Sequence, residues 1–324
     1  MIELTNITKR FGKHTALDDL TLHIGEGEVY GFIGPNGAGK STSMKILSGL
    51  LTPDSGAASV CGVNCIKHPE QIKMLIGYMP DFLGVYDDLT VDEYLQFFAA
   101  AFGIERRRRR AVVAGVIELV DLGAKRDAMV DALSRGMQQR LGVARVLLHE
   151  PKVLLLDEPA SGLDPRARIE LRELIGELRA MGKTIMVSSH ILSELGEMST
   201  SIGIIERGKL LFSGSIASAI AKAGVGEQVA VKLEIAPARL AVSDKATELL
   251  RVSDGLINDP RVLRSRVEGE VLMVDLKPTE QGGSPGHHFL IEQIMASGHH
   301  IASFSPHQVR LEDVFLRLTK GVLN

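Results

Sequence analysis

Tryptophan is absent from this sequence, aromatic residues make up only 4%, and there are only two cysteines in 324 residues. Cys61 and Cys65 are too few for a disulfide framework, which favours a reducing, cytoplasmic compartment. Their Cys-x-x-x-Cys spacing would also suit half of a metal site. No second pair of cysteines exists to complete such a site, so two ordinary thiols are the favoured interpretation.

Long apolar runs are absent as well. No stretch of 18 or more apolar residues occurs, so the sequence predicts no membrane-spanning helix. Residues 1–11 lack the apolar segment of a secretory signal peptide. If the protein acts at a membrane, we expect another polypeptide to supply the membrane span.

A strong charge of either sign is also missing. The formal net charge is −3, so the overall charge gives no attraction to nucleic acid, and no nucleic-acid partner is expected. The contents of 45% hydrophobic and 24% charged residues are those of a globular protein. Many glycines and few aromatics in an aliphatic chain favour an α/β fold with parallel strands.

The length and the changes of pattern along the chain predict two domains. We place the first at residues 1–221, with a helical subdomain at about residues 88–148, and the second at residues 222–324. The second is predicted to be a small accessory or regulatory α+β domain. Its element order, βαββαβ with an added helix at residues 311–318, suggests the ferredoxin-like type.

A glycine-rich loop lies near the start of the chain. Residues 1–34 predict short strands joined by turns, and the last strand, residues 28–33, leads into Gly34-x-x-x-x-Gly39-Lys40-Ser41. A strand before and a helix after are the context that a P-loop needs. The glycines allow backbone N–H groups to surround phosphate oxygens, Lys40 adds a positive charge, and the Ser41 hydroxyl is a Mg²⁺ ligand. The loop therefore predicts a site for a nucleoside triphosphate.

Two adjacent carboxylates follow a second predicted strand. The aliphatic run at residues 153–156 delivers Asp157 and Glu158 at its carboxyl end, where α/β sheets bind ligands. Asp157 would hold Mg²⁺, and Glu158 would polarise an attacking water as a general base. Alone, the run is equally consistent with a buried strand that ends in a solvated acidic turn. Together with the P-loop, it indicates nucleotide hydrolysis.

The segment Leu133-Ser134-Arg135-Gly136-Met137-Gln138 is the most specific motif. It precedes a predicted helix, Ser134 suits its N-cap, and it lies shortly before the acidic strand. It resembles the LSGGQ signature of the ATP-binding cassette (ABC) family, and the resemblance covers about residues 1–221. This implies a P-loop NTPase fold of ABC type, with a mixed sheet core and a helical subdomain, that hydrolyses ATP.

The resemblance also implies a role for each matching residue. Phe11 matches the aromatic that stacks on adenine, and Ser134 and Gly136 match residues that contact ATP bound to the opposite subunit. His190 matches a histidine that contacts the γ-phosphate, and Asp164 belongs to a loop at the dimer seam. The predicted catalytic residues are Glu158, His190 and Lys40. The predicted ATP-binding residues are Phe11, Gly34, Pro35, Asn36, Gly37, Ala38, Gly39, Lys40, Ser41, Thr42, Asp81, Ser134, Gly136, Asp157 and Asp164. The predicted Mg²⁺ ligands are Ser41, Asp157 and Asp81.

The chain departs from the family pattern at two positions. Asp81 stands where the family usually has glutamine, which adds a negative charge near the phosphates and leaves its role open. Met137 replaces the usual signature glutamine. Gln138 follows it, but one residue on a helix turns a side chain by about 100°, so Gln138 is not a substitute.

The resemblance implies two partners, a second ABC subunit, with a homodimer favoured, and an integral-membrane permease. The chain is therefore expected on the cytoplasmic face of the membrane. Residues 76–80 and the C-terminal extension are most similar to ABC-2-type exporter ATPases. The alternative is a soluble ABC ATPase without transport, of the assembly-factor or repair type.

Three further features leave alternatives open. Six of the 14 aromatic residues lie between residues 82 and 102, either as a helical core or as a surface for the permease, with Phe82 and Tyr86 the favoured contacts. Five consecutive arginines, residues 106–110, predict a solvated face, with contact to anionic lipid as the alternative. Two pairs of adjacent histidines, at residues 287–288 and 299–300, are weak evidence for a metal site.

Overall fold

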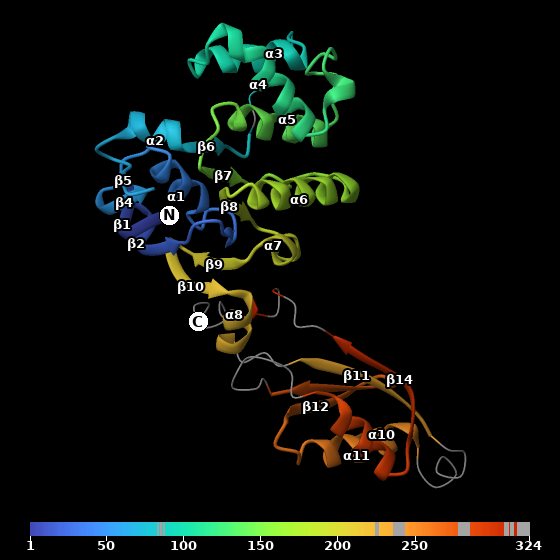
Figure 1. The fold of residues 1–324 in the computed structure, drawn as a ribbon. Helices are drawn as coiled ribbons and strands as arrows, with labels where there is room; N and C mark the ends of the chain where they lie inside the picture. The colour runs from blue at the N-terminus through green and yellow to red at the C-terminus, as the bar shows by residue number, and fades with distance from the viewer. Residues whose placement is uncertain are drawn as a thin grey trace. The chain divides into compact units, whose positions relative to one another are not determined.

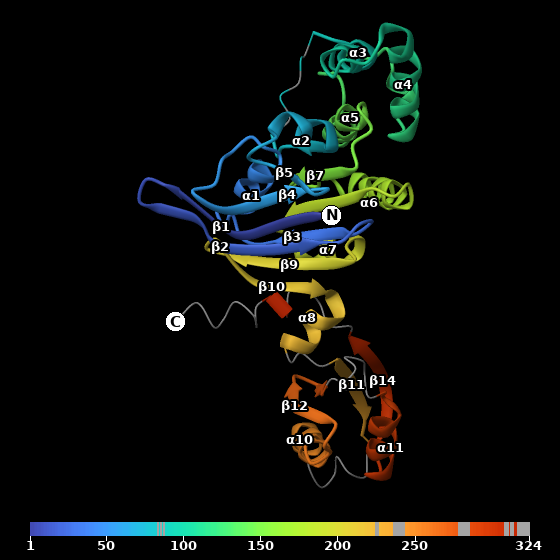
Figure 2. The same ribbon diagram turned by 60° about the vertical axis from the view of Figure 1, so that its left-hand side comes forward.

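The structure is a computed structural model of the whole chain, shown in Figures 1 and 2. It describes all residues except 83, 85, 87, 224–226, 236–243, 278–285, 308–310, 312–313 and 316–324. The chain divides into two compact units, Met1–Gly214 (unit 1) and Ser215–Asn324 (unit 2). Among the described residues, no helix combines the length and the apolar character needed to cross a membrane.

A six-stranded sheet with the order β10-β9-β3-β8-β7-β6 forms the centre of unit 1. Its strands are β3 (Val29–Ile33), β6 (Ile76–Met79), β7 (Val153–Asp157), β8 (Thr184–Ser189), β9 (Ser201–Glu206) and β10 (Lys209–Ser215). The five strands from β9 to β6 pair in parallel. All residues of β3, β7 and β8 are buried, as expected for strands covered on both faces. The predicted strand at 153–156 is confirmed.

A second, antiparallel sheet of unit 1 has the order β2-β1-β4-β5. Its strands are β1 (Ile2–Phe11), β2 (His14–Ile24), β4 (Ser55–Val60) and β5 (Val63–Asn64). The prediction of short strands over residues 1–34 is wrong, because β1 and β2 form one long hairpin. Irregularities in the β1–β2 register interrupt the alternation of buried and exposed residues, and this hid its length from the sequence. Helix α1 (Lys40–Leu47) contacts both sheets, and the three share one apolar core.

The segment predicted to be helical holds α3 (Val91–Ala101), α4 (Arg106–Leu119), the 3₁₀ helix η1 (Gly123–Lys125) and α5 (Arg135–Leu147). These helices lie together in Figures 1 and 2. The start of α3 is a capping box: Thr90 Oγ1 accepts a bond from the Glu93 N–H, and Glu93 Oε2 accepts one from the Thr90 N–H. The remaining helices of unit 1 are α2 (Pro69–Leu75), α6 (Pro165–Ala180) and α7 (Leu192–Met198).

Unit 2 contains α8 (Ile216–Ala223), β11 (Gln228–Glu234), α10 (Lys245–Leu256), β12 (Val262–Glu268), β13 (Val271–Leu276), α11 (His288–Ala296) and β14 (His300–His307). From β11 onward the order is βαββαβ, and the antiparallel sheet runs β12-β13-β11-β14. Both helices lie on the same face of this sheet and share its apolar core (Figure 2). The predicted ferredoxin-like arrangement is confirmed. Most of the helix predicted at residues 311–318 lies outside the described residues.

Candidate functional site

The predicted site residues follow four adjacent strands of the central sheet. Strands β3, β8, β7 and β6 are parallel neighbours, so their carboxyl ends meet at one edge. The glycine-rich loop follows β3, His190 follows β8, Glu158 follows β7, and Asp81 comes shortly after β6. This edge is where α/β sheets bind ligands, because loops and helix N-termini converge there.

The glycine-rich loop is shaped by close backbone contacts. Gly39 has a φ of 113°, which side chains rarely allow, and it forms the N-cap of α1. A Cβ on Gly34 would lie 2.3 Å from the carbonyl oxygen of Ile205. Pro35, Asn36 and Gly37 are exposed, whereas Ala38, Gly39 and Lys40 are buried. The loop therefore holds the N-terminus of α1, with its unpaired N–H groups, open to an anion.

Glu158 lies between two nitrogen groups. Its Oε1 is 3.1 Å from Lys40 Nζ, and its Oε2 accepts a bond of 2.7 Å from Nδ1 of His190. Lys40 Nζ also donates to the carbonyl oxygen of Gly34 at 2.7 Å. The side chains of Lys40 and Glu158 are 6% and 10% exposed, whereas that of His190 is 42% exposed. The three predicted catalytic residues thus form one buried cluster that opens to solvent at His190.

Ser188 connects the Asp157 carboxylate to the backbone of Glu158 and was not among the predicted site residues. Its hydroxyl donates to Asp157 Oδ1 at 2.6 Å and accepts a bond of 2.9 Å from the Glu158 N–H. This fixes the backbone of Glu158, which has a positive φ of 50°. The only sequence signal for Ser188 was a polar residue near the end of the otherwise apolar strand β8 (Thr184–Ser189).

Asp81 lies near this cluster and is exposed. Desolvation, followed by the negative charges of Asp157 and Glu158, raises the pKa of the Asp81 carboxyl, and the Arg135 guanidinium partly offsets this. A carboxylate in this position is therefore repelled by the negative charges of Asp157 and Glu158. The structure brings Asp81 into the electrostatic range of the predicted catalytic residues.

The other predicted ATP-binding residues gather elsewhere. Ser134 caps α5, where its Oγ accepts a bond from the Met137 N–H, and Asp164 caps α6 by accepting from the Ala167 N–H. A Cβ on Gly136 would lie 2.8 Å from that of Ala167. Phe11 ends β1 with its ring half exposed. The signature and the seam residue thus form a second group, at the starts of α5 and α6.

The donors present fit both ATP and Mg²⁺. Ser41 and Thr42 begin α1 and are half-buried, next to the buried ammonium of Lys40. Ser41, Asp157 and Asp81 supply hydroxyl and carboxylate oxygens, which are the ligands that Mg²⁺ prefers.

In unit 2, His287, His288 and His299 each pair with a carboxylate. Among the described residues, no three or more histidine, cysteine, aspartate or glutamate side chains gather to hold a metal ion.

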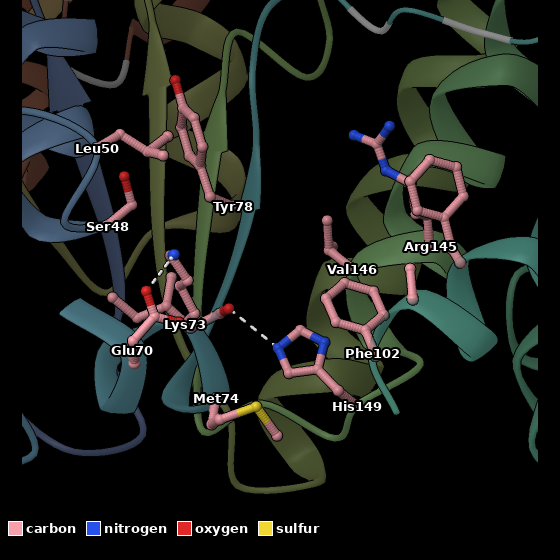
Figure 3. Close-up of a pocket in the computed structure, with 13 residues that line it drawn as sticks. Ser48, Leu50, Glu70, Lys73, Met74, Tyr78, Phe102, Arg145, Val146 and His149 are labelled. Atoms are coloured by element: carbon pink, nitrogen blue, oxygen red, sulfur yellow. Dashed lines mark hydrogen bonds and ion pairs between the residues drawn. The ribbon is translucent and has the colours of Figure 1, made fainter. Parts of the chain in front are cut away.

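A groove with a volume of about 490 Å³ lies between α2 and β6 on one side and α3 and α5 on the other. Figure 3 shows Leu50 and Tyr78 on one wall, facing Phe102 and Val146 on the other. The His149 Nε2–H donates to the carbonyl oxygen of Ile76, and its ring stacks on Phe102. Among the described residues, His149 Nδ1 and Tyr78 Oη are buried without a hydrogen-bond partner.

Of the two aromatic residues predicted to contact a partner, Tyr86 lies beside this groove. Phe82 is 84% exposed and Tyr86 is 52% exposed. Tyr86 packs against the rings of Phe97 and Phe98, and Phe98 lines the groove. Tyr94, in contrast, is fully buried. The cluster therefore has a buried core, as the first interpretation expects, and an exposed rim, whose contact with a permease stays a prediction.

Known proteins resemble this chain over its whole length. The ABC transporter family model matches residues 17–161. The Nod factor export ATP-binding protein I of Paraburkholderia xenovorans is 34% identical over 98% of this chain and 96% of that protein. The bacitracin transport ATP-binding protein BcrA of Bacillus licheniformis is 41% identical over 65% of this chain and 68% of that protein.

Solved structures agree with the fold of unit 1. The structure of an ATP-binding subunit of an ABC transporter covers 68% of this chain and 92% of its own, with a TM-score of 0.62 and 29% identity. A dimeric, post-hydrolysis structure of the cassette MJ0796 bound to ADP and phosphate has a TM-score of 0.60 at 24% identity. It covers 67% of this chain and 99% of its own.

Proposed function

This chain belongs to the ABC transporter family as an ATP-binding subunit with ATPase activity, and from this we propose that Glu158 is the general base of its hydrolysis reaction. The observation that carries the proposal is the position of the Glu158 carboxylate, 3.1 Å from Lys40 and 2.7 Å from His190. A carboxylate at the end of β7 has the reach to polarise a water beside a phosphate held by the glycine-rich loop.

Nucleotide binding would change the partners of Glu158. Lys40 bonds to Glu158 and to the Gly34 carbonyl oxygen, and the β- and γ-phosphates of ATP compete for the same ammonium group. Release of Lys40 leaves Glu158 oriented by His190 and by the bond that its backbone N–H donates to Ser188 Oγ. Mg²⁺, held by Ser41, Asp157 and Asp81, would supply charge neutralisation at the phosphate oxygens. Phe11 would stack on the adenine.

We propose further that two copies of the chain enclose ATP head to tail. Ser134 and Gly136 lie beside the start of α6, in a different group from Lys40 and Glu158. Their predicted contact with the γ-phosphate would then come from the second copy. Binding closes the pair, and loss of the γ-phosphate contacts opens it. The chain holds one cassette, so a homodimer is the simplest assembly.

The groove beside Tyr86 is the proposed docking place for a membrane permease. Its apolar walls and exposed aromatic rim are the composition of a protein interface. Burial lowers the pKa of His149, which favours the neutral ring. Because Nε2 donates to a carbonyl oxygen, Nδ1 is a hydrogen-bond acceptor. The docked segment should therefore bring an apolar side chain with an N–H or O–H donor nearby.

Relatives named for Nod factor export and bacitracin transport favour an exporter on the cytoplasmic face of the membrane. The transported substrate would be chosen by the permease. The second candidate is a soluble ABC ATPase without transport, which is compatible with the same catalytic cluster. A neighbouring reading frame that encodes a polytopic membrane protein would favour the transporter.

The proposed docking is tested by ATPase assays with the co-purified permease. Tyr86→Ala should reduce the stimulation by the permease and leave the basal rate of the isolated chain unchanged. Met181→Ala, which removes a similarly exposed apolar side chain from unit 1, is the matched control. Stimulation that is unchanged in Tyr86→Ala, or reduced equally in both variants, would refute the docking site.

A further inference from the structure

Helix α4 begins with five consecutive arginines, Arg106–Arg110, which we call the arginine cluster. Arg106, Arg107, Arg108 and Arg110 are exposed, and the Arg107 side chain is 91% exposed. Arg109 is half-buried, and its Nε donates to the carbonyl oxygen of Ile104 at 2.7 Å. One arginine thus anchors the helix start, and four present their charge to solvent.

The cluster is unfavourable for the helix that carries it. Cations at a helix N-terminus oppose the helix dipole, and Arg106 and Arg110 repel each other at the i, i+4 spacing. The first turn of α4 has no acidic residue, and the Glu105 side chain makes no capping bond. Among the described residues, the only ion pair of the cluster joins Arg107 to Glu105 at 3.3 Å. An anion from outside the chain would remove this local cost.

Other arginines of the same subdomain are paired. Arg126 forms an ion pair with Asp92 at 2.6 Å, and Arg140 pairs with Asp121 and with Glu170. Carboxylates that can pair with arginine are therefore available in this part of the chain. The excess of positive charge is a local property of the arginine cluster.

The cluster also continues an apolar surface. A shallower cavity of about 270 Å³ is lined by Arg108 together with Met74, Phe102 and His149. The last three residues also line the groove described above. Cations next to an exposed apolar rim are the combination that favours a membrane interface.

We propose that the arginine cluster binds the anionic phospholipid headgroups of the membrane. Consecutive residues of a helix are turned by about 100°, so the four exposed arginines spread over an arc of about 200° at the start of α4 and do not form one stripe. An acidic peptide would need a stripe of cations, whereas mobile headgroups can approach each exposed arginine separately. The cluster offsets the negative net charge of the chain only locally. This interaction is additional to the proposed docking of the permease and does not need it.

Vesicle co-sedimentation of the full chain tests the proposal. Vesicles of phosphatidylcholine alone are compared with vesicles that also contain phosphatidylglycerol, at low and at high salt. We expect binding only to the anionic vesicles and its loss at high salt. Each arginine near the surface should contribute about fivefold in partition, so the triple variant Arg106→Gln, Arg107→Gln, Arg110→Gln should bind about 100-fold more weakly.

The matched control removes three exposed cations elsewhere in unit 1: Lys67→Gln, Arg179→Gln, Arg207→Gln. An equal loss of binding in the control would show that only the net charge matters, and would overturn the proposal. Binding of the wild type to both kinds of vesicle alike, or to neither, would overturn it too. If only the co-purified permease, without lipid, distinguishes the arginine variant, the cluster binds an acidic protein segment instead.

Two measurements separate binding from folding. The triple variant should keep or raise the unfolding temperature, because it removes repulsion at a helix start. A second variant, Arg106→Lys, Arg107→Lys, Arg110→Lys, keeps the charge and should keep vesicle binding. If this lysine variant loses binding while it stays folded, charge is not the basis of the interaction and the proposal fails.

Discussion

Each unit of the molecule contains a buried glutamate bonded to a histidine, and the two pairs differ in what surrounds them. In unit 1, Glu158 accepts from His190 at 2.7 Å. In unit 2, Glu248 accepts from His299 at 3.1 Å. The His190 side chain is 42% exposed, whereas that of His299 is 3% exposed. The chemistry of the pairs is the same, but only the first is open to solvent.

The second partners of the two glutamates lead to the same conclusion. Glu158 contacts Lys40 of the glycine-rich loop, and its own backbone has a positive φ. Glu248 lies within a regular helix and accepts from Arg251 one turn away, while His299 is also bonded to Ser297. The first pair joins the ends of two strands at an open edge, and the second joins a helix to a turn inside a core. A Glu–His contact is therefore evidence of catalysis only with access and a substrate-binding neighbour.

Exchange of each glutamate for glutamine is the strongest test of this comparison. Glu158→Gln should lower ATP turnover by roughly 10²- to 10⁴-fold, because it removes the general base, and should accumulate as an ATP-bound dimer. Glu248→Gln should leave turnover close to that of the wild type. Steady-state ATPase assays and size-exclusion chromatography with ATP measure both effects. Near wild-type turnover in Glu158→Gln would refute its role.

Removal of His190, the histidine of the solvent-exposed pair in unit 1, should have the next largest effect on ATP turnover. His190→Ala removes the N–H that orients Glu158, and we expect turnover to fall about 10- to 100-fold, as for the loss of a bond to a charged group. The side chain is well exposed, so the unfolding temperature should stay the same. An unchanged rate, or a fall in rate that a fall in stability explains, would contradict the functional role.

Removal of His299, the histidine of the buried pair in unit 2, should lower stability and leave ATP turnover unchanged. His299→Ala leaves buried polar partners behind, which should destabilise unit 2 by about 2 kcal/mol and lower its unfolding temperature by about 10 °C. ATP turnover measured below that transition should be unchanged. Scanning calorimetry of the full chain measures the shift. If turnover falls and the unfolding temperature does not, unit 2 has a direct part in the reaction.

We expect a smaller, pH-dependent effect on the stability of unit 2 from the carboxylate of Asp259. Hydrogen bonds from the Arg261 guanidinium, aided by one from Gln293, hold the pKa of Asp259 well below its usual range. The stability that Asp259 contributes is therefore complete above its unfolded pKa of about 3.9 and is lost as the pH falls toward the folded value. Asp259→Asn should destabilise unit 2 at pH 7 and flatten its loss of stability in acid. Urea unfolding at several pH values measures this, and identical pH profiles for both proteins would contradict it.

Much of the fold could be read from the sequence because its signals are local. The strand at 153–156 and the βαββαβ order of unit 2 follow from patterns within a few residues, and both agree with the prediction. The β1–β2 hairpin was misjudged because its irregular register breaks the alternation on which strand prediction depends. The helix that begins with the arginine cluster was also missed as a separate element, since five cations are unfavourable at a helix start.

The sequence by itself determined the chemistry of the site: a glycine-rich loop, a lysine, two adjacent carboxylates and a signature segment are runs of neighbouring residues. It also determined the order of elements in unit 2 from β11 onward. Only the tertiary structure decided which groups meet, because the strand order β3-β8-β7 places residues 40, 158 and 190 together although they are far apart in the chain. It also brought Ser188 between the Asp157 carboxylate and the Glu158 backbone N–H, and it gave the Glu–His pairs of the two units their different access to solvent. Contacts between distant segments depend on how strands pair and on what covers them, and no local pattern encodes either.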